Sequence, residues 1–285
     1  MNWPTWNQSA VAAVIAVVIA AVARRRARPG WESHIAPAAT EFALIAGLYT
    51  VWRVARKLPL AQPDGAIERA HRIEDFERRI HLPSELTLQH WFLRHDTVAH
   101  LTNVYYATLH VPVLIGFLVW LYVRHRDQFP HWRNALAILT GFCLFIRFIR
   151  VAPPRFLPGY VDLATRYGMS LYGPVNKGIS DQFAAMPSIH VGWAAVVSFG
   201  IVATSTSKWR WLALSYVTLT FIAVSATGNH WWLDGIVACF LLWLSLVIDN
   251  AVRRYHRSRG AATSGAAAEA PHGDQSESED VRSST

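Results

Sequence analysis

Three short stretches of the chain place arginine, serine, histidine and aspartate beside long apolar runs. "APPRF" carries Arg155, "MPSIH" carries Ser188 and His190, and "GNHWWLD" carries His230 and Asp234. Ionisable residues are costly inside membrane-spanning segments, so the ones that border such segments usually have a function. These five residues are therefore the first candidates for a chemical role.

The stretch "MPSIH" has the residues of a helix start. Pro187 and Ser188 are typical of helix entry, and serine is a favoured N-cap. A helix N-terminus offers free backbone N–H groups and a partial positive charge, which suit a bound anion. His190 would then lie in the first turn beside that anion. A capped helix with a histidine that reaches the membrane interface is the alternative interpretation.

His230 and Asp234 are four residues apart, which places them on one helix face, one turn from each other. A carboxylate in this position can accept a proton from one imidazole nitrogen and make the other nitrogen a better base or nucleophile. Alternatively, the two residues form an interfacial pair that only stabilises the helix.

Three arginines border the same region. Arg155 follows two prolines just after an apolar run, while Arg147 and Arg150 lie near the end of that run. Each could bind phosphate oxygens, or could instead anchor the chain at the membrane interface, and we expect the latter for at least one of Arg147 and Arg150.

Taken together, these groups have the composition of a phosphoryl-transfer site. One histidine can attack phosphorus and the other can protonate the leaving oxygen, while arginine and a helix N-terminus stabilise the phosphate. The sequence supplies no cysteine or carboxylate cluster beside them. Cys143 and Cys239 both lie in apolar segments, where they are expected to be buried apolar residues. We therefore predict neither a metal nor a cofactor.

The composition predicts a membrane protein that crosses the bilayer several times. Apolar residues make up 52% of the 285 residues and charged residues only 16%, with 13 tryptophans, whereas about a quarter of a soluble domain is charged. The net charge of +8 comes from short basic clusters beside apolar runs. That distribution is typical of membrane topology and argues against nucleic-acid binding.

A spanning helix needs roughly 20 mostly apolar residues, and seven segments meet this need. They are residues 1–23, 36–56, 97–123, 134–151, 182–207, 211–233 and 231–251. The charges of the first segment follow its apolar run, whereas those of a signal peptide precede it, so we expect this segment to be retained.

The basic loops predict the orientation. If "RRRARPG" is cytoplasmic, the basic stretches at 124–133, 207–210 and 253–259 are cytoplasmic too. The connections 57–97, 152–187 and 228–231 then face outward. All three stretches that could perform chemistry would thus meet at the outer face of the plasma membrane.

Two segments outside the spans also have a predicted structure. Ile67, Ala70, Ile73, Phe76 and Ile80 recur at helical spacing, which predicts an amphipathic helix on the outer surface or, alternatively, a solvated loop helix. The small and acidic polar residues after Gly260 predict a disordered cytoplasmic tail. We divide the chain into an N-terminal span and linker (1–35), a membrane domain (36–256) and a tail (257–285).

The order "APPR", "MPSIH" and "GNHWWLD" resembles the type 2 phosphatidic acid phosphatase superfamily, especially its inositolphosphotransferase branch, over roughly residues 36–251. This resemblance implies an all-α protein with a six-helix membrane core, here extended by one N-terminal span. It also implies a metal-independent reaction in which His230 is the phosphate-attacking nucleophile, Asp234 orients it, and His190 is the general acid. Arg155 and Ser188 would hold the phosphate.

Two positions depart from the superfamily pattern. Phe148 stands where the first motif usually has a lysine, so Arg147 or Arg150 would have to replace that cation. Val224 stands where the third motif usually has an arginine, a loss that favours the inositolphosphotransferase branch.

The sequence leaves the reaction open between hydrolysis of a lipid phosphate and transfer of a phosphorylated head group to an alcohol. A phosphohistidine can be attacked by water or by an alcohol. The alternative from another class is a catalytically inactive protein that binds or transports lipids. A transporter would more naturally have broken helices in the middle of the membrane or inverted repeats. The oligomeric state is not predicted.

Overall fold

The computed structural model describes residues 4–26, 34–55, 65–167 and 182–268, with side chains up to residue 259. Over these ranges the protein is helical, and its β-type pairing is a single bridge between Val151 and Ala184. The predicted all-α fold is confirmed.

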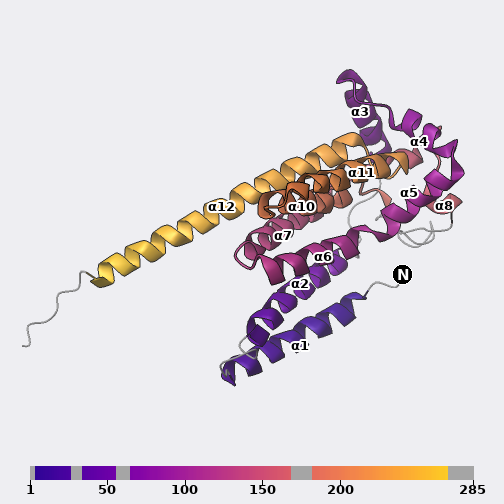
Figure 1. Cartoon of the computed structure of the whole chain (residues 1–285). Helices are drawn as coiled ribbons and strands as arrows, with labels where there is room; N and C mark the ends of the chain where they lie inside the picture. Colours follow the sequence, from indigo (N-terminus) through magenta and orange to yellow (C-terminus); the bar gives the residue numbers. More distant parts are fainter. Residues whose placement is uncertain (1–3, 27–33, 56–64, 168–181, 269–285) are drawn as a thin grey trace, which may run out of the picture.

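The centre of the fold is a bundle around α10 (Ile189–Thr204). It packs against α6 (His110–Arg124), α7 (Phe129–Ile146), α11 (Ala213–Ala226) and the long α12 (Trp232–Ala268), as Figure 1 shows. The small residues of α10 allow this central position. At Gly200, a Cβ atom would lie 2.2 Å from Cζ of Phe117, so glycine is needed for α6 to approach so closely.

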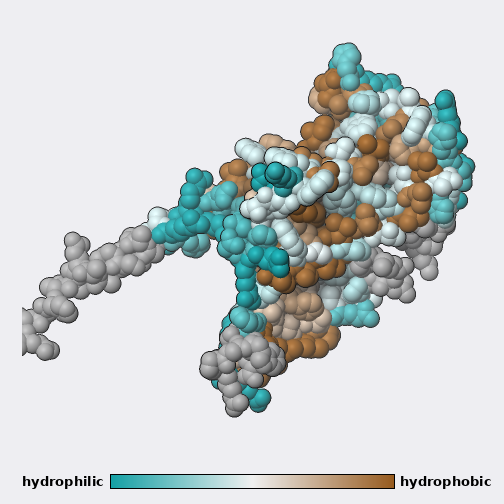
Figure 2. Space-filling model, viewed as in Figure 1, coloured by the Kyte–Doolittle hydropathy of each residue, from teal (hydrophilic) through white to brown (hydrophobic). Residues whose placement is uncertain are grey.

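Two N-terminal helices form a hairpin beside this bundle. α1 (Trp6–Arg25) packs along α2 (Ile35–Ala55), and a hydrogen bond joins the hydroxyl groups of Ser9 and Thr50. α2 contacts α7, where Arg133 forms an ion pair with Glu41. Apolar residues also cover much of the bundle surface in Figure 2, as expected of a protein surrounded by lipid.

Among the described residues, four helices are long and apolar enough to cross a membrane: α1, α2, the segment Lys208–Ala226 and Trp232–Arg259. α5 (Asp96–Thr108) and α6 together give a fifth, bent by 49° between them. The predicted spans at 134–151 and 182–207 correspond to α7 and to the 16-residue α10, which do not meet the same criteria. The second is shorter than predicted because residues 182–188 are not part of the helix.

The chain remains helical further than the sequence predicts. We expect disorder after Gly260, but α12 continues to Ala268. The prediction is wrong for these residues because "AATSGAAA" is rich in alanine, the strongest helix former. Residues 269–285 lie outside the described part of the chain.

Short helices cover the end of the bundle at which α10 and α12 begin, here called the motif end. They are α3 (Ala66–Arg79), α4 (Glu85–Leu93) and α8 (Leu163–Arg166). The predicted amphipathic helix is α3, and Ala70 and Ile73 pack inward as expected. Ile67, Phe76 and Ile80 are instead exposed, and Glu77 is buried in their place.

Candidate active site

Backbone hydrogen bonds join the three chemistry-bearing stretches at the motif end. The N–H of Arg155 donates to the carbonyl of Gly228 over 2.9 Å, and the N–H of Ser188 donates to that of Asp234 over 3.1 Å. Val151 exchanges hydrogen bonds with Phe183 and Ala185, just before Ser188. Each stretch is therefore tied to the other two by main-chain contacts.

A left-handed turn brings the third stretch into this position. α11 ends at Ala226, and Gly228 then adopts a φ of +69°, while the N–H groups of Asn229 and His230 both donate to the carbonyl of Val224. A side chain at position 228 would also lie 2.9 Å from Nε2 of Gln89. Glycine thus reverses the chain and leaves space for its neighbours.

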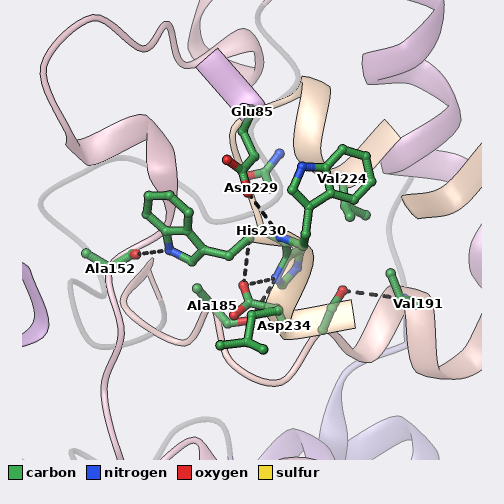
Figure 3. A network of polar contacts seen from close by, with 12 residues as sticks. Glu85, Ala152, Ala185, Val191, Val224, Asn229, His230 and Asp234 are labelled. Carbon is green, nitrogen blue, oxygen red and sulfur yellow. Dashed lines mark hydrogen bonds and ion pairs between the residues drawn. The ribbon is translucent and has the colours of Figure 1, made fainter. Parts of the chain in front are cut away.

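His230 is held by one ring nitrogen (Figure 3). Its Nδ1 lies 2.7 Å from the carbonyl oxygen of Ala185 and 3.3 Å from Oδ2 of Asp234. Because the Ala185 carbonyl can only accept, Nδ1 carries the proton and Nε2 has the free electron pair. Nε2 is buried and has no hydrogen-bond partner among the described residues. This is the arrangement that a nucleophilic histidine requires.

Asp234 is fully buried, and its Oδ2 also accepts a hydrogen bond from the N–H of Trp231 over 2.9 Å. The indole N–H of Trp231 donates to the carbonyl of Ala152 over 3.0 Å. The carboxylate is thereby fixed by its own helix start, and that helix start is fixed to the segment before Arg155.

His190 faces His230 from the first turn of α10, with ring centroids 5.8 Å apart. Ser188 is the N-cap of α10, and its Oγ accepts from the N–H of Val191 over 3.4 Å, which confirms the predicted cap. The histidine is thus at a helix N-terminus and close to the candidate nucleophile. The His190 ring also contacts Tyr106 and His110, at centroid distances of 4.5 and 5.0 Å.

Arg155 is connected to the candidate nucleophile, His230, through the neighbouring Asn229. Its side chain is only 4% exposed, and its guanidinium donates to Oδ1 of Asn229 and lies 3.8 Å from Oδ2 of Asp162. Asn229 precedes His230 directly, and its own amide donates to Thr227. A buried guanidinium at this point is well placed to contact a phosphate on His230.

The other two arginines differ in position. Arg150 is buried, its carbonyl accepts a hydrogen bond from the Nε of Arg69, and it directly precedes the paired residue Val151. Arg147 is the half-buried C-cap of α7. Phe148, at the position of the missing lysine, is 47% exposed, and Val224 belongs to the apolar core. Of the two arginines, Arg150 is the closer to the site along the backbone.

Two glutamates that no sequence motif indicates cap α12. The N–H of Trp232 donates to Glu85 over 3.2 Å, and that of Leu233 donates to Glu77 over 2.6 Å. Burial raises the pKa of Glu77 to about 9, with further contributions from its hydrogen bond to Glu85 and from the charge of Glu85. Glu77 is therefore protonated at neutral pH. The clue in the sequence was position 77, seven residues after Ala70 and so on the same buried face.

A third histidine, His110, lies near His190 and His230 and was not among the residues predicted from the sequence. It is buried at the start of α6, and its ring lies within contact of His190. Within the described ranges, no group of three or more histidine, cysteine, aspartate or glutamate side chains is arranged to hold a metal ion.

One of the comparisons with known proteins gives a family. The family model described as the PAP2 superfamily matches residues 71–248, more than half of the chain and all three stretches. No curated protein and no solved structure gives a match.

Proposed function

Because the chain belongs to the PAP2 superfamily, we propose that it is an integral membrane enzyme that transfers a phosphoryl group from a lipid through a phosphohistidine on His230. The observation that supports this proposal is the hydrogen bonding of the two ring nitrogens of His230. Nδ1 donates to Ala185 and Asp234, and Nε2 is buried without a partner among the described residues, in a ring whose centroid lies 5.8 Å from that of His190.

The reaction would take two steps. Nε2 of His230 attacks phosphorus, the bond from phosphorus to the lipid oxygen breaks, and His190 gives its proton to that oxygen. A water or alcohol then attacks phosphorus, its proton goes to His190, and the bond from phosphorus to nitrogen breaks. Asp234 stabilises the imidazolium of His230, while Arg155 and the N-terminus of α10 stabilise the phosphate charge. Ser188 would hold the phosphate through the N-terminus of α10, which it caps. Arg150, or alternatively Arg147, would replace the lysine that the first motif usually has at the position of Phe148.

The second step decides between hydrolysis and transfer. Attack by water makes the protein a lipid phosphatase, and attack by an alcohol makes it a head-group transferase of the inositolphosphotransferase kind. The loss of arginine at Val224 supports the second outcome.

We also propose that the motif end faces outward across the plasma membrane. The end opposite to it contains His131, Asn134 and Arg253, which all contact the buried carboxylate of Asp249. The basic stretches thus gather at the end that the positive-inside rule assigns to the cytoplasm.

Trapping the covalent intermediate tests the proposal. Purified protein is incubated with phosphatidate labelled on phosphorus, quenched in alkali, and examined for acid-labile label. We expect label on the wild type and on Ser198→Ala, which changes a buried serine in α10 away from the site. His230→Ala should carry none. Label that persists in His230→Ala would reject His230 as the nucleophile, and an unlabelled, inactive wild type would reject the reaction.

A further inference from the structure

The bent pair α5–α6 presents one continuous buried face to the bundle. Its residues are spaced three or four apart along both helices: Ala99, Asn103, Tyr106, His110, Leu114, Phe117 and Leu121. The part near the motif end is polar, and the part beyond His110 is apolar. Since polar side chains inside a membrane are costly, the polar part needs an explanation.

Two members of this face have polar atoms without partners. Both the Nδ2 and the Oδ1 of Asn103 are buried without a hydrogen bond to any described residue, and so is Nε2 of His110. Leaving a buried donor or acceptor unpaired costs about 1–3 kcal/mol, and native proteins seldom accept this without a functional reason. Buried atoms of this kind also occur singly, as at Oγ of Ser198, but three of them on one helix face that reaches His190 point to a ligand that can hydrogen-bond to them.

The position of His110 places this ligand beside the reacting groups. Its Nδ1 lies 3.1 Å from the hydroxyl of Tyr216, so Nε2 is the nitrogen available to a ligand. Its ring is 5.0 Å from that of His190, which is 5.8 Å from His230. Tyr105, which bonds to Thr220 over 2.8 Å, fixes α5 against α11 at the same level.

The available groups fit hydroxyls better than a phosphate. Asn103 offers two N–H donors and a carbonyl acceptor, and His110 offers one ring nitrogen, so neither brings a fixed charge. Sugar and polyol hydroxyls both donate and accept and can satisfy all of them. A fixed cation is instead supplied by Arg155, which contacts Asn229 next to His230.

We propose that Asn103 and His110 form a binding site for the hydroxyl groups of a polyol that lies next to the phosphorus. The position next to the phosphorus rests on the proposed function. The polyol has two possible sources, because it can arrive as the acceptor alcohol or as the head group of the lipid donor. Both would present the same hydroxyl groups to Asn103 and His110.

Polyol binding is tested first without catalysis. Asn103→Leu and His110→Phe remove the unpartnered atoms, and Ser198→Ala, which also removes a buried unpartnered oxygen, is the matched control. We expect myo-inositol to raise the melting temperature of the wild type and the control more than that of either variant. An equal rise, or no rise, in all four proteins would overturn the proposal. Without inositol, Asn103→Leu should melt no lower than the wild type, since an unpaired amide is replaced by an apolar group.

Two catalytic arms then distinguish the sources. The first assay uses labelled phosphatidate and free myo-inositol. If the site binds the acceptor, the variants should form the intermediate at the wild-type rate, but the ratio of inositol phosphate to inorganic phosphate should be at least tenfold lower. With labelled phosphatidylinositol, a donor site predicts slower formation of the intermediate from this lipid alone. If both variants behave like the wild type in both assays, Asn103 and His110 do not form a polyol-binding site. Absence of any intermediate in the wild type would reject the proposed function, while the melting test would still decide whether the polyol binds.

Discussion

The two ring nitrogens of His230 have different surroundings, and in the proposed mechanism this difference divides the catalytic roles between His230 and His190. Nδ1 faces the acceptors of Ala185 and Asp234, whereas Nε2 is free to attack. His190 lies across from it at a helix N-terminus, where it can reach the leaving oxygen. One histidine is thus needed with every substrate, and the other only when the leaving group needs a proton.

Leaving-group dependence therefore identifies the general acid. General acid catalysis contributes about 10²–10⁴-fold, and less is needed when the leaving group is already acidic. We expect His190→Ala to lose about that factor with phosphatidate but to recover much of the phosphoenzyme formation with p-nitrophenyl phosphate. His230→Ala should remain inactive with both. Phosphoenzyme in His230→Ala but none in His190→Ala would show that the roles are reversed.

For single residues, the sequence predicts contacts between side chains but not contacts with backbone groups. The spacing of His230 and Asp234 predicts their contact, and "MPSIH" predicts the cap at Ser188. The carbonyl of Ala185, which is the closer partner of His230, could not be predicted, because a backbone acceptor leaves no trace in residue type. His110 was missed for a related reason, since a histidine inside an apolar run has no local partner that reveals its role.

Among the elements, the start of α12 determines the site. Asp234 lies in its first turn, whereas His230 precedes the helix by two residues, so the prediction that both lie on one helix face is wrong although their side chains are in contact. The free N–H groups of α12 are capped by Glu77 and Glu85, which come from α3 and α4. Two adjacent buried carboxyl groups remain stable only while one keeps its proton, as the raised pKa of Glu77 indicates. The contact between α3 and α4 and the start of α12 thus depends on the proton of Glu77.

The contribution of Glu77 to stability should therefore fall as the pH rises. The pKa of Glu77 is about 9 in the folded protein and about 4.3 in an unfolded chain. Between these values the folded state keeps a proton that the unfolded state has released, so the free energy of unfolding decreases with pH and levels off above about 9. Glu77→Gln keeps the acceptor for Leu233 and cannot ionise. Its melting temperature should decline less between pH 6 and pH 9, and a decline equal to that of the wild type would contradict the shared proton.

The packing of α10 gives a second test among the elements. Gly200→Ala would place a methyl group 2.2 Å from the ring of Phe117, whereas a methyl group at Gly141 in α7 meets nothing within 4 Å. Overpacking typically costs about 1–3 kcal/mol, while alanine in an open helix position gains up to about 1 kcal/mol over glycine. We expect the melting temperature to fall for Gly200→Ala and to hold or rise for Gly141→Ala. A stable Gly200→Ala would mean that α6 and α10 are less tightly packed.

Apolar runs predicted that these helices exist better than they predicted where the helices begin and end. The run at 182–207 includes residues before Ser188 that pair with Val151 instead of continuing the helix. α3 was predicted from its isoleucines, yet Glu77 is buried while Ile67 is exposed. Hydropathy cannot predict that Glu77 is buried in place of Ile67. The burial of Glu77 depends on the backbone N–H of Leu233 in α12, which needs a hydrogen-bond acceptor from another helix.

At the scale of the whole molecule, the two ends of the bundle differ in chemistry. The motif end contains His110, His190 and His230 with the buried glutamates, and at the opposite end His131 and Arg253 contact Asp249. Hydrophilic residues also cover α12 where it leaves the bundle in Figure 2. An asymmetric distribution of arginine sets the orientation of membrane proteins, so these ends should lie on opposite sides of one membrane.

Site-specific labelling decides which end faces outward. Ser170→Cys lies between the first and second chemistry-bearing stretches, and Ala270→Cys lies just beyond α12. The native Cys143 is buried and Cys239 is half-buried within α12, and the unmodified chain gives the background. On intact cells, an impermeant thiol reagent should label position 170 and reach position 270 only after the membrane is opened. The reverse pattern would place the motif end in the cytoplasm and require the phosphorylated lipid to come from the inner leaflet. Label at both positions on intact cells would mean that the two ends share one side, which a helix crossing the membrane from Trp232 to Arg259 does not allow.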